Sequence, residues 1–517
     1  MTVTSSRRLA LAAFALLASC TRTVAGPPPT ATPTPAPTPA PAPRRDPNVV
    51  PAVDRELRAL WVATVANIDW PSRPGLPADQ QRAELVSLLD RAAATGMNAI
   101  IFHVRPNADA VYRSTHEPWA SMISGTQGTD PGYDPLAFAI EESHRRGMEL
   151  HAWVNPFRAG NASDSTRVAP NHVFRERPDL VRIYGQTFWM DPGEPAVHDR
   201  SMRAILDIVN RYDVDGVHLD DYFYPYPQSD SARRPLSFPD SATYARFGNG
   251  MSIDDWRRSN VDRFVERLYR DVHAAKPPVR VSISPFGIWR PGNPAQVTGL
   301  DAYAAIYADA RKWLQSGWVD YLVPQLYWRI DPPQQSFTAL LDWWLSQNIL
   351  DRHVAPGLAT YRVYATTNPY PVSEIANQVA AIRARGAAGV VFFNATSTLS
   401  RGNGEIASML RRDFFTDGAL PPAATWLGGT PPARPTIAVG SATANGAAVT
   451  LTPAGDPPRW WVIRYRTGDR WTTRTIFGAA RTATLASANG APVDWVVVSA
   501  VNAQGAMGDE AVWRSQT

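Results

Sequence analysis

Cysteine is nearly absent from this chain of 517 residues, in which Cys20 is the only one. A single cysteine excludes an intramolecular disulfide framework. Excess charge is also missing: the formal net charge is +4, so we expect no nucleic-acid partner. The sequence has no glycine-rich nucleotide loop, serine nucleophile elbow or cysteine nucleophile, and we therefore expect no cofactor.

Beyond the N-terminal region, no segment is long and apolar enough to span a membrane. The apolar run Leu9–Ala18 follows two arginines and has the length of a signal-peptide core. It leads into Cys20 through Leu-Ala-Ser, which resembles a bacterial lipobox; the alternative is an ordinary secretory signal with a chance cysteine. We predict that residues 1–20 are a lipoprotein signal and that Cys20 carries a lipid anchor in the cell envelope. Thr21, in place of Asp, favours the periplasmic face of the outer membrane.

Proline is abundant instead, with 47 residues that are not spread evenly. Residues 21–54 cannot bury a core and are predicted to be an extended, polyproline-like tether. Residues 416–434 form a second Pro- and Gly-rich stretch, which we predict to be a linker. These stretches leave a large domain at 55–415 and a small one at 435–517.

Short β-rich runs alternate with longer amphipathic runs through the large domain. Eight strands alternating with eight helices predict an α/β fold, a closed (β/α)8 TIM barrel. An open doubly wound sheet is disfavoured because no phosphate-binding loop follows the first strand. The expected strands are 57–65, 98–105, 149–155, 216–220, 280–285, 321–327, 354–360 and 389–394. The expected helices are 78–95, 135–146, 196–212, 253–275, 300–315, 334–347, 372–385 and 405–414.

The small domain contains short β-rich runs separated by turn residues, at 436–439, 447–452, 460–465, 471–476 and 493–500. This spacing predicts a β-sandwich of fibronectin type III character. The segment carries no evident catalytic residues, so we expect it to bind a ligand or to act as a spacer.

The fourth predicted barrel strand ends in two adjacent carboxylates, Asp220 and Asp221, which are followed by four aromatic residues up to position 226. Barrel enzymes hold their working groups at the carboxyl ends of the strands. Glycoside hydrolysis needs one carboxyl group beside the developing cation and another that protonates the leaving oxygen, while aromatic rings hold the sugar. We therefore predict that Asp220 and Asp221 are catalytic.

Polar and aromatic residues recur at the ends of the other strands, where they can orient a hydroxyl-rich ligand. This recurrence predicts that the partner of the site is a polysaccharide. The predicted substrate-binding residues are His103, Arg105, His151, Trp153, Asn155, His218, Tyr222, Tyr224, Trp289, Arg290, Gln325, Tyr327 and Trp328.

Several long motifs, in order over about residues 55–400, resemble the glycoside-hydrolase-like family 10 barrel of bacterial envelope proteins. They are ELRALWVATVANIDWPS, HVRPNADAVYRSTHEPWA, GYDPLAFAIEESHRRGMELHAWVNPFRAG, DVDGVHLDDYFYPYP, SISPFGIWR and DYLVPQLYW. The resemblance implies a TIM barrel distantly similar to the α-amylase-type barrels, with glycosidase activity. One enterobacterial relative acts on peptidoglycan glycan strands stripped of stem peptides, which implies denuded glycan as the substrate here.

The resemblance leaves the catalytic roles open. Alignment with the amylase-type fourth strand puts Asp220 on the nucleophile, but the glutamate acid of those enzymes has no counterpart at 284–287. Alignment with the family 18 chitinase motif makes Asp220 an orienting residue and puts Tyr222 at the position of the acid. Reserve candidates for the missing acid are Asp109, Glu117 and Glu194.

Two alternative functions follow from the same residues. Histidines on three successive strands, His103, His151 and His218, raise the hypothesis of a zinc-dependent hydrolase. The first strand lacks a His-x-His pair, and inward histidines can equally bond a sugar or one another, so we predict no metal. Because the fifth strand brings no acid, a non-catalytic glycan-binding scaffold of the envelope is the alternative to a glycosidase.

Overall fold

The computed structural model describes residues 46–487 and 490–515. The predicted signal peptide, Cys20 and most of the predicted tether lie outside the described residues. Residues 50–515 belong to one compact unit. In the described part of the chain, no helix has both the length and the apolar character needed to cross a membrane.

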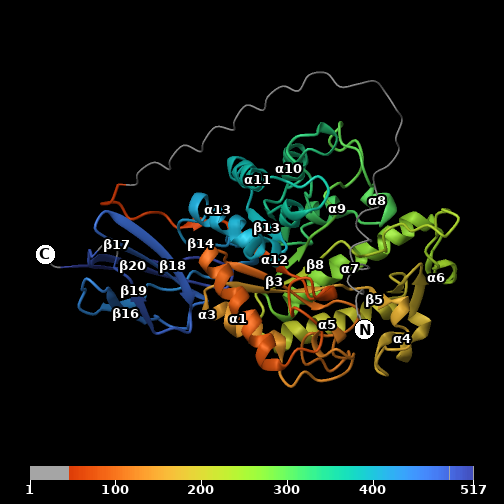
Figure 1. Cartoon of the computed structure of the whole chain (residues 1–517), viewed down its shortest axis with the longest axis horizontal. Coiled ribbons are helices and arrows are strands. Elements are labelled where there is room, and N and C mark those ends of the chain that lie inside the picture. The colour runs from red at the N-terminus through yellow and green to blue at the C-terminus, as the bar shows by residue number, and fades with distance from the viewer. Residues whose placement is uncertain (1–45, 488–489, 516–517) are drawn as a thin grey trace, which may run out of the picture. The chain divides into compact units, whose positions relative to one another are not determined.

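Nine parallel strands form one sheet in the order β11-β10-β9-β8-β4-β3-β2-β13-β12 (Figure 1). Its two end strands, β11 (His353–Val354) and β12 (Gly357–Ala359), are consecutive pieces of one segment that pairs with β10 on one side and β13 on the other. The sheet therefore closes on itself, with β11 and β12 sharing one barrel position. The remaining strands are β2 (Leu57–Val62), β3 (Ala99–Arg105), β4 (Glu149–Val154), β8 (Gly216–Leu219), β9 (Arg280–Ile283), β10 (Tyr321–Leu322) and β13 (Gly389–Phe393).

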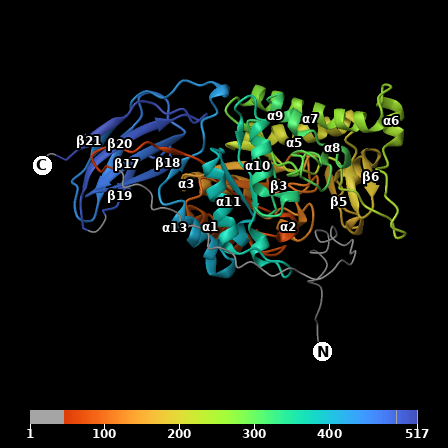
Figure 2. The same cartoon turned by 90° about the horizontal axis from the view of Figure 1, so that it is seen from above.

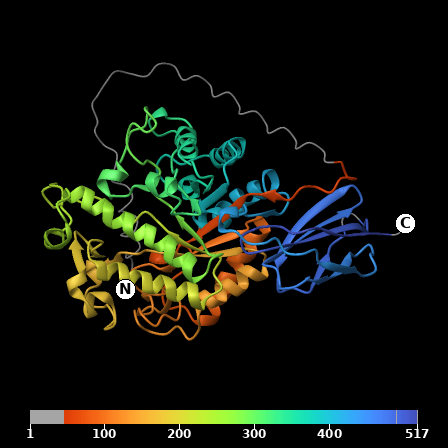
Figure 3. The same ribbon diagram turned by 180° about the vertical axis from the view of Figure 1, so that it is seen from behind.

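Helices cover the outside of the barrel, and Figure 3 shows two of them, α5 and α7, side by side. The predicted α/β alternation is confirmed. The long helices are α1 (Ala78–Thr95), α3 (Pro135–Arg145), α5 (Pro195–Arg211), α7 (Ile253–Ala275), α10 (Phe337–Ser346), α11 (Val372–Ala384) and α13 (Glu405–Asp413).

The predicted helix at 300–315 was wrong, because the segment forms two short helices, α8 (Ala302–Ala305) and α9 (Ala310–Gln315). Asp301 and Asp309 each accept a backbone N–H at the start of one of them, so two N-caps begin two helices. Between the helices Tyr307 has a φ of 57°, which a continuous right-handed helix does not allow.

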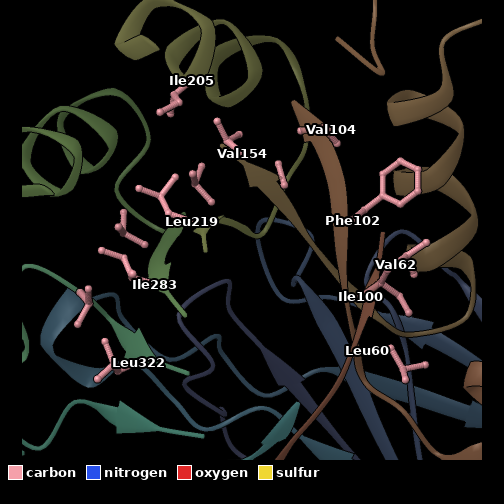
Figure 4. Packing of buried hydrophobic residues seen from close by; sticks show 14 of the residues in the cluster. Leu60, Val62, Ile100, Phe102, Val104, Val154, Ile205, Leu219, Ile283 and Leu322 are labelled. Atoms are coloured by element: carbon pink, nitrogen blue, oxygen red, sulfur yellow. The ribbon is translucent and has the colours of Figure 1, made fainter. Parts of the chain in front are cut away.

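Alternate strand residues divide the barrel core into two layers. Ile100, Phe102 and Val104 of β3 pack outward against the helices, together with Leu219 and other branched residues (Figure 4). The residues between them point into the barrel, where Ile101 belongs to a separate buried cluster. This period of two also directs the side chain of His103 inward, and a β-bulge between His103 and Arg105 interrupts it before Arg105.

Insertions that the sequence did not predict enlarge the loops after the barrel strands. After β4, the strands β5 (Arg158–Asn161), β6 (Val181–Tyr184) and β7 (Thr187–Met190) form an antiparallel sheet in the order β5-β7-β6. They lie toward the side of the barrel that faces away from the C-terminal strands (Figures 1 and 2). Shorter helices in these loops are α2 (Ser121–Ser124), α4 (Val173–Glu176), α6 (Ser241–Phe247) and α12 (Ala395–Leu399).

The C-terminal segment forms two antiparallel sheets, β15-β16-β19 and β18-β17-β20-β21, as its turn spacing predicted. Trp461 and Leu485 are fully buried in the core between them. Two strands, β19 and β21, were not predicted. The strands are β15 (Thr436–Val439), β16 (Ala447–Thr452), β17 (Trp460–Thr467), β18 (Arg470–Phe477), β19 (Thr482–Leu485), β20 (Val493–Val501) and β21 (Ala511–Arg514).

The predicted linker contains ordered contacts. Its strand β14 (Ala419–Leu420) pairs in parallel with β1 (Asp54–Arg55). Arg459, just before β17, forms an ion pair of 2.6 Å with Asp215, which lies just before β8. The C-terminal sheets thus contact the amino-terminal ends of the barrel strands, and the carboxyl ends remain available for a site.

Candidate active site

Two aspartates directly follow β8, at the carboxyl end of the fourth barrel strand. Because Val217 and Leu219 belong to the core outside the barrel, His218 and Asp220 point to the inside. Asp221 begins the loop. Asp220 is 5% exposed and Asp221 is 4% exposed, so both carboxylates are nearly enclosed.

Asp220 is held by residues of β4 and by its own loop. The Trp153 Nε1–H donates to Asp220 Oδ2 at 3.1 Å, and the Tyr222 backbone N–H donates to Oδ1 at 3.1 Å. The same indole N–H lies 3.2 Å from Asn155 Oδ1, and the Asn155 amide donates to the Pro106 carbonyl at 3.2 Å. The structure thus brings Trp153 and Asn155, both predicted as site residues, into the group that positions Asp220.

Asp221 is held by Tyr226 of its own loop and by Gln325, which lies after β10. The Tyr226 hydroxyl donates to Asp221 Oδ2, and the Gln325 side chain also hydrogen-bonds this carboxylate. Gln325 Nε2 further donates to the Ser284 carbonyl at 3.0 Å. Gln325 was predicted from its position at a strand end. Tyr226 belongs to the aromatic run but was not predicted, because sequence spacing does not show how a loop folds back.

Burial raises the pKa of both carboxyl groups. The pKa of Asp220 rises to about 8 because of burial and of the negative charge of Asp221. The pKa of Asp221 rises to about 6 because of burial, which the hydrogen bond from Tyr226 partly offsets. Within residues 46–487 neither carboxylate forms an ion pair. Since the groups interact, their protons belong to the pair, which holds one proton and one negative charge between about pH 6 and 8.

Partly exposed aromatic rings surround the aspartate pair. The ring centroids of contacting neighbours are 5.6 to 6.3 Å apart. Burial raises the pKa of Tyr327, and the charges of Asp221 and Asp220 raise it further, so this ring lies beside the pair. Flat rings in such positions can stack on sugar rings. The rings belong to Tyr222, Tyr226, Phe286, Tyr327, Trp328, Tyr361 and Phe393.

Three of these rings, Phe286, Tyr361 and Phe393, were missed by the sequence analysis. Phe286 follows β9, Tyr361 follows β12 and Phe393 ends β13. The rule that selected Gln325 and Tyr327, proximity to the carboxyl end of a strand, applies equally to them. A search of every predicted strand end for aromatic residues would have found all three.

His103 is buried next to the aspartate pair. Its ring stacks on Trp153, with centroids 3.8 Å apart and an interplanar angle of 11°. Burial lowers its pKa well below the usual value, so the ring is neutral. Among the described residues neither of its ring nitrogens has a hydrogen-bond partner, and the buried Ser284 Oγ also has none. Because unpaired buried polar atoms are costly, these atoms are available to a polar ligand.

The other two inward histidines are engaged inside the barrel. The His151 ring bonds the Tyr321 hydroxyl at 2.7 Å and a glutamate carboxylate at 3.1 Å. The His218 ring bonds Trp61 Nε1 at 3.0 Å and Ser282 Oγ at 2.7 Å. We therefore assign His151 and His218 to the barrel core rather than to substrate binding. In the part of the chain that the structure describes, no group of three or more His, Cys, Asp or Glu side chains could hold a metal.

Arg105 and Glu117 form a fully buried ion pair. The Nη2–Oε1 distance is 2.5 Å and the Nε–Oε2 distance is 2.7 Å. Although burial opposes ionisation, the Arg105 guanidinium holds the pKa of Glu117 below its usual value. Arg105 also donates to the carbonyls of Asn155 and Pro156. With its donors engaged, Arg105 belongs to the framework rather than to substrate binding, and Glu117 is not available as an acid.

The other two reserve acids also have protein partners. Glu194 lies 3.5 Å from Arg182 and 3.1 Å from Arg246. Asp109 accepts hydrogen bonds from Gln127 Nε2 at 2.9 Å and from a backbone N–H at 3.0 Å. Neither contacts the aspartate pair, and we do not carry them forward as acids.

Three predicted binding residues make their contacts away from the pair. Tyr224 is fully buried, with its hydroxyl 3.4 Å from Asn260 Nδ2. Trp289 donates to Asp309 at 2.9 Å, and Arg290 lies 3.3 Å from an aspartate in the loop after β9. The aromatic run after Asp221 therefore divides between the site and the core.

A parallel barrel that presents an aspartate pair among aromatic rings at its carboxyl end supplies the carboxyl groups and ring surfaces that glycoside cleavage uses. The chain belongs to the glycosyl hydrolase-like 10 family, whose model matches residues 56–372. The resemblance found in the sequence is thereby confirmed, and the protein is a glycosidase.

Similar proteins are also named as glycosyl hydrolases. The chain is 40% identical over 398 residues to glycosyl hydrolase YngK of Bacillus subtilis (strain 168), covering 74% of this chain and 76% of the relative. It is 34% identical over 321 residues to glycosyl hydrolase DigH of Escherichia coli (strain K12), covering 58% of this chain and 72% of the relative. Among solved structures, it resembles the PgaB (BpsB) glycoside hydrolase domain from Bordetella bronchiseptica with a TM-score of 0.46 and 14% identity, covering 69% of this chain and 98% of that one.

Proposed function

We propose that the protein hydrolyses O-glycosidic bonds in peptidoglycan glycan strands that lack stem peptides. The observation that carries the proposal is the enclosed pair Asp220 and Asp221, which holds one exchangeable proton at neutral pH among partly exposed aromatic rings. The sequence resemblance to envelope enzymes supports denuded glycan as the polymer. Rings contributed by several strand ends suit a chain of sugars better than a single one.

The proposal extends to the location of the enzyme. A lipid on Cys20 would hold the chain at the periplasmic face of the outer membrane, and the Pro-rich stretch before residue 50, where the compact unit begins, would give the barrel reach toward the cell wall. A tethered enzyme of this kind acts on an insoluble polymer within the length of its tether.

The C-terminal sheets are proposed to be a fibronectin type III-like module that supports the barrel. Support comes from the division into three and four strands, β15-β16-β19 and β18-β17-β20-β21. Their contacts with the barrel, such as Arg459 with Asp215, lie at the strand ends opposite Asp220. The module therefore acts as a spacer that leaves the catalytic end open to a long substrate.

The test is to incubate the purified protein with denuded glycan strands and to measure strand length by chromatography. Wild type is expected to shorten the strands, and Asp220→Asn to abolish shortening while its circular dichroism stays unchanged. Asp342→Asn is the matched control, because its side chain is 57% exposed on α10. Full activity of Asp220→Asn would remove that residue from catalysis. Binding of strands by wild type without cleavage would favour the scaffold alternative.

A further inference from the structure

The site contains two carboxylates, and both come from the same strand end. All other buried acids in the described residues have structural partners, such as Arg257 for Asp240 and Arg280 for Glu149. The fifth barrel strand continues into Ser284, Pro285 and Phe286, which are not acids. Asp220 and Asp221 must therefore supply all the carboxylate chemistry of the site.

Among the described residues, Asp69 contacts the segment after β13, where its two carboxylate oxygens accept the backbone N–H groups of Ala63 at 2.9 Å and Thr396 at 2.7 Å. In the closed order of the sheet, β13 lies opposite β8, and it ends in Phe393 followed by Asn394. The Asn394 side chain caps α12 by accepting the Ser397 N–H at 2.9 Å. An ordinary glycosidase sets one carboxyl group on each side of the scissile bond, about 5–5.5 or 6.5–9.5 Å apart. Here both groups stand on one wall, and Asp69, which is bonded to the segment after β13, already uses both oxygens to hold backbone N–H groups.

We propose that the missing nucleophile is supplied by the substrate, through the carbonyl oxygen of a 2-acetamido group on the sugar whose bond is cut. This inference rests on the proposed function and names its substrate class: the sugar on the non-leaving side must carry an N-acyl group. Peptidoglycan glycan meets this requirement at every position, because both of its sugars are 2-acetamido sugars.

The reaction balances with the two aspartates alone. The acetamide oxygen attacks C1, the glycosidic C–O bond breaks, and the leaving oxygen takes its electron pair together with a proton from one aspartic acid. The other aspartate accepts a hydrogen bond from the acetamide N–H and stabilises the positive charge of the cyclic oxazolinium intermediate. Water then attacks C1 and returns its proton to the first aspartate, the acetamide re-forms, and the configuration at C1 is retained.

The direction of each side chain divides the two roles. Asp220 points into the barrel between Trp153 and the β9 end, where His103 and Ser284 hold unpaired polar atoms. The buried part of the sugar, its acetamide, belongs there, so Asp220 holds the N–H. Asp221 begins the loop beside the partly exposed Tyr226 and Gln325, which is the side of the departing chain, so Asp221 is the acid.

Before substrate binds, the higher pKa is that of Asp220, about 8 against about 6 for Asp221, so the proton must move to Asp221 when the sugar binds. The mechanism needs one neutral acid and one carboxylate at the start, and the coupled pair holds one proton between about pH 6 and 8. Binding of the acetamide N–H favours the charge on the residue that accepts it, which moves the shared proton to the other residue.

The decisive experiment changes only the acyl group. Denuded glycan strands are N-deacetylated and then re-acylated with acetyl, monofluoroacetyl, difluoroacetyl or trifluoroacetyl groups. Fluorine weakens the carbonyl nucleophile, so the rate should fall along the series by at least about a hundredfold, equivalent to about 2.7 kcal/mol of barrier. Equal rates on acetylated and trifluoroacetylated strands, or inversion at C1, would overturn the inference. Failure to cut even the re-acetylated strands would instead overturn the proposed function.

Two variants test the division of roles, with Asp342→Asn again as the control. Asp221→Asn should lose most activity on glycan strands but keep it on aryl glycosides of a chitooligosaccharide, whose good leaving groups need no protonation. Asp220→Asn should lose activity on both, because the acetamide is no longer held. The reverse pattern would overturn the assignment of the acid to Asp221.

Discussion

Replacement of Asp220 by asparagine should make the protein more stable at alkaline pH while it inactivates the enzyme. The folded pKa of Asp220 is about 8, raised from 3.8 by burial and by Asp221. A group with a raised pKa stabilises the fold fully below its unfolded pKa, and this contribution is lost as the pH rises through the folded value. Asparagine has no proton to lose, so the variant avoids the cost of a buried second charge.

The size of the effect follows from the shift. Each pH unit between about 4 and 8 should move the unfolding free energy in favour of the variant by about 1.4 kcal/mol, to a total on the order of 5 kcal/mol. The hydrogen bonds from Trp153 and Tyr222 change as well, since the new amide has only one acceptor oxygen, but that cost is constant with pH. The difference between the two curves is therefore the informative quantity.

Urea unfolding of wild type and Asp220→Asn at pH 4.5, 6, 7 and 8.5 measures this difference. The expected result is a variant whose relative stability rises steadily over that range. Two curves that run parallel from pH 4.5 to 8.5 would show that Asp220 titrates normally and would refute the account of an enclosed, coupled pair. The exposed Asp342→Asn change should leave the pH dependence as in wild type.

The pH profile of kcat/KM should be bell-shaped, with limbs near about 6 and 8, and a flat profile across pH 5–9 would contradict the shared proton. Glu117→Ala should lower the unfolding free energy by about 3–5 kcal/mol in urea titration, because it leaves Arg105 charged and buried without its partner. Arg459→Met should lower the melting temperature without changing kcat, since its partner Asp215 lies at the far end of β8; a changed kcat would connect the sandwich to the site. Glycan cleavage should survive dialysis against EDTA, and a loss restored by zinc would revive the metal hypothesis.

The sequence predicted the barrel because its helices and strands carry strong periodic patterns. The helices α1 and α7 begin and end where the amphipathic runs do. The antiparallel insertion β5-β7-β6 was missed because its strands have only four residues each, too few to show a periodic pattern in the sequence. A single helix over 300–315 was expected, because the periodicity of an amphipathic run does not show that it contains two helix N-caps.

Site residues could be predicted where they lie at the ends of strands. They could not be predicted where their role depends on a side-chain partner from a distant loop. Asp220 and Asp221 follow β8 directly, and Gln325 falls in the strand predicted at 321–327, so strand assignment located them. The ion pair of Arg105 could not be predicted. Its partner Glu117 lies in a loop twelve positions later, and no sequence pattern shows how that loop folds back. For the same reason Tyr224, two residues from a residue of the site, turned out to lie in the core.

The most direct test of the account is a crystal structure of Asp221→Asn with a bound N-acetylated oligosaccharide. The account predicts a sugar at the carboxyl end of β8, with its acetamide N–H within about 2.6–3.2 Å of the Asp220 carboxylate and its ring against the surrounding aromatic side chains. A saccharide bound only elsewhere on the barrel, with Asp220 enclosed and out of contact, would contradict it.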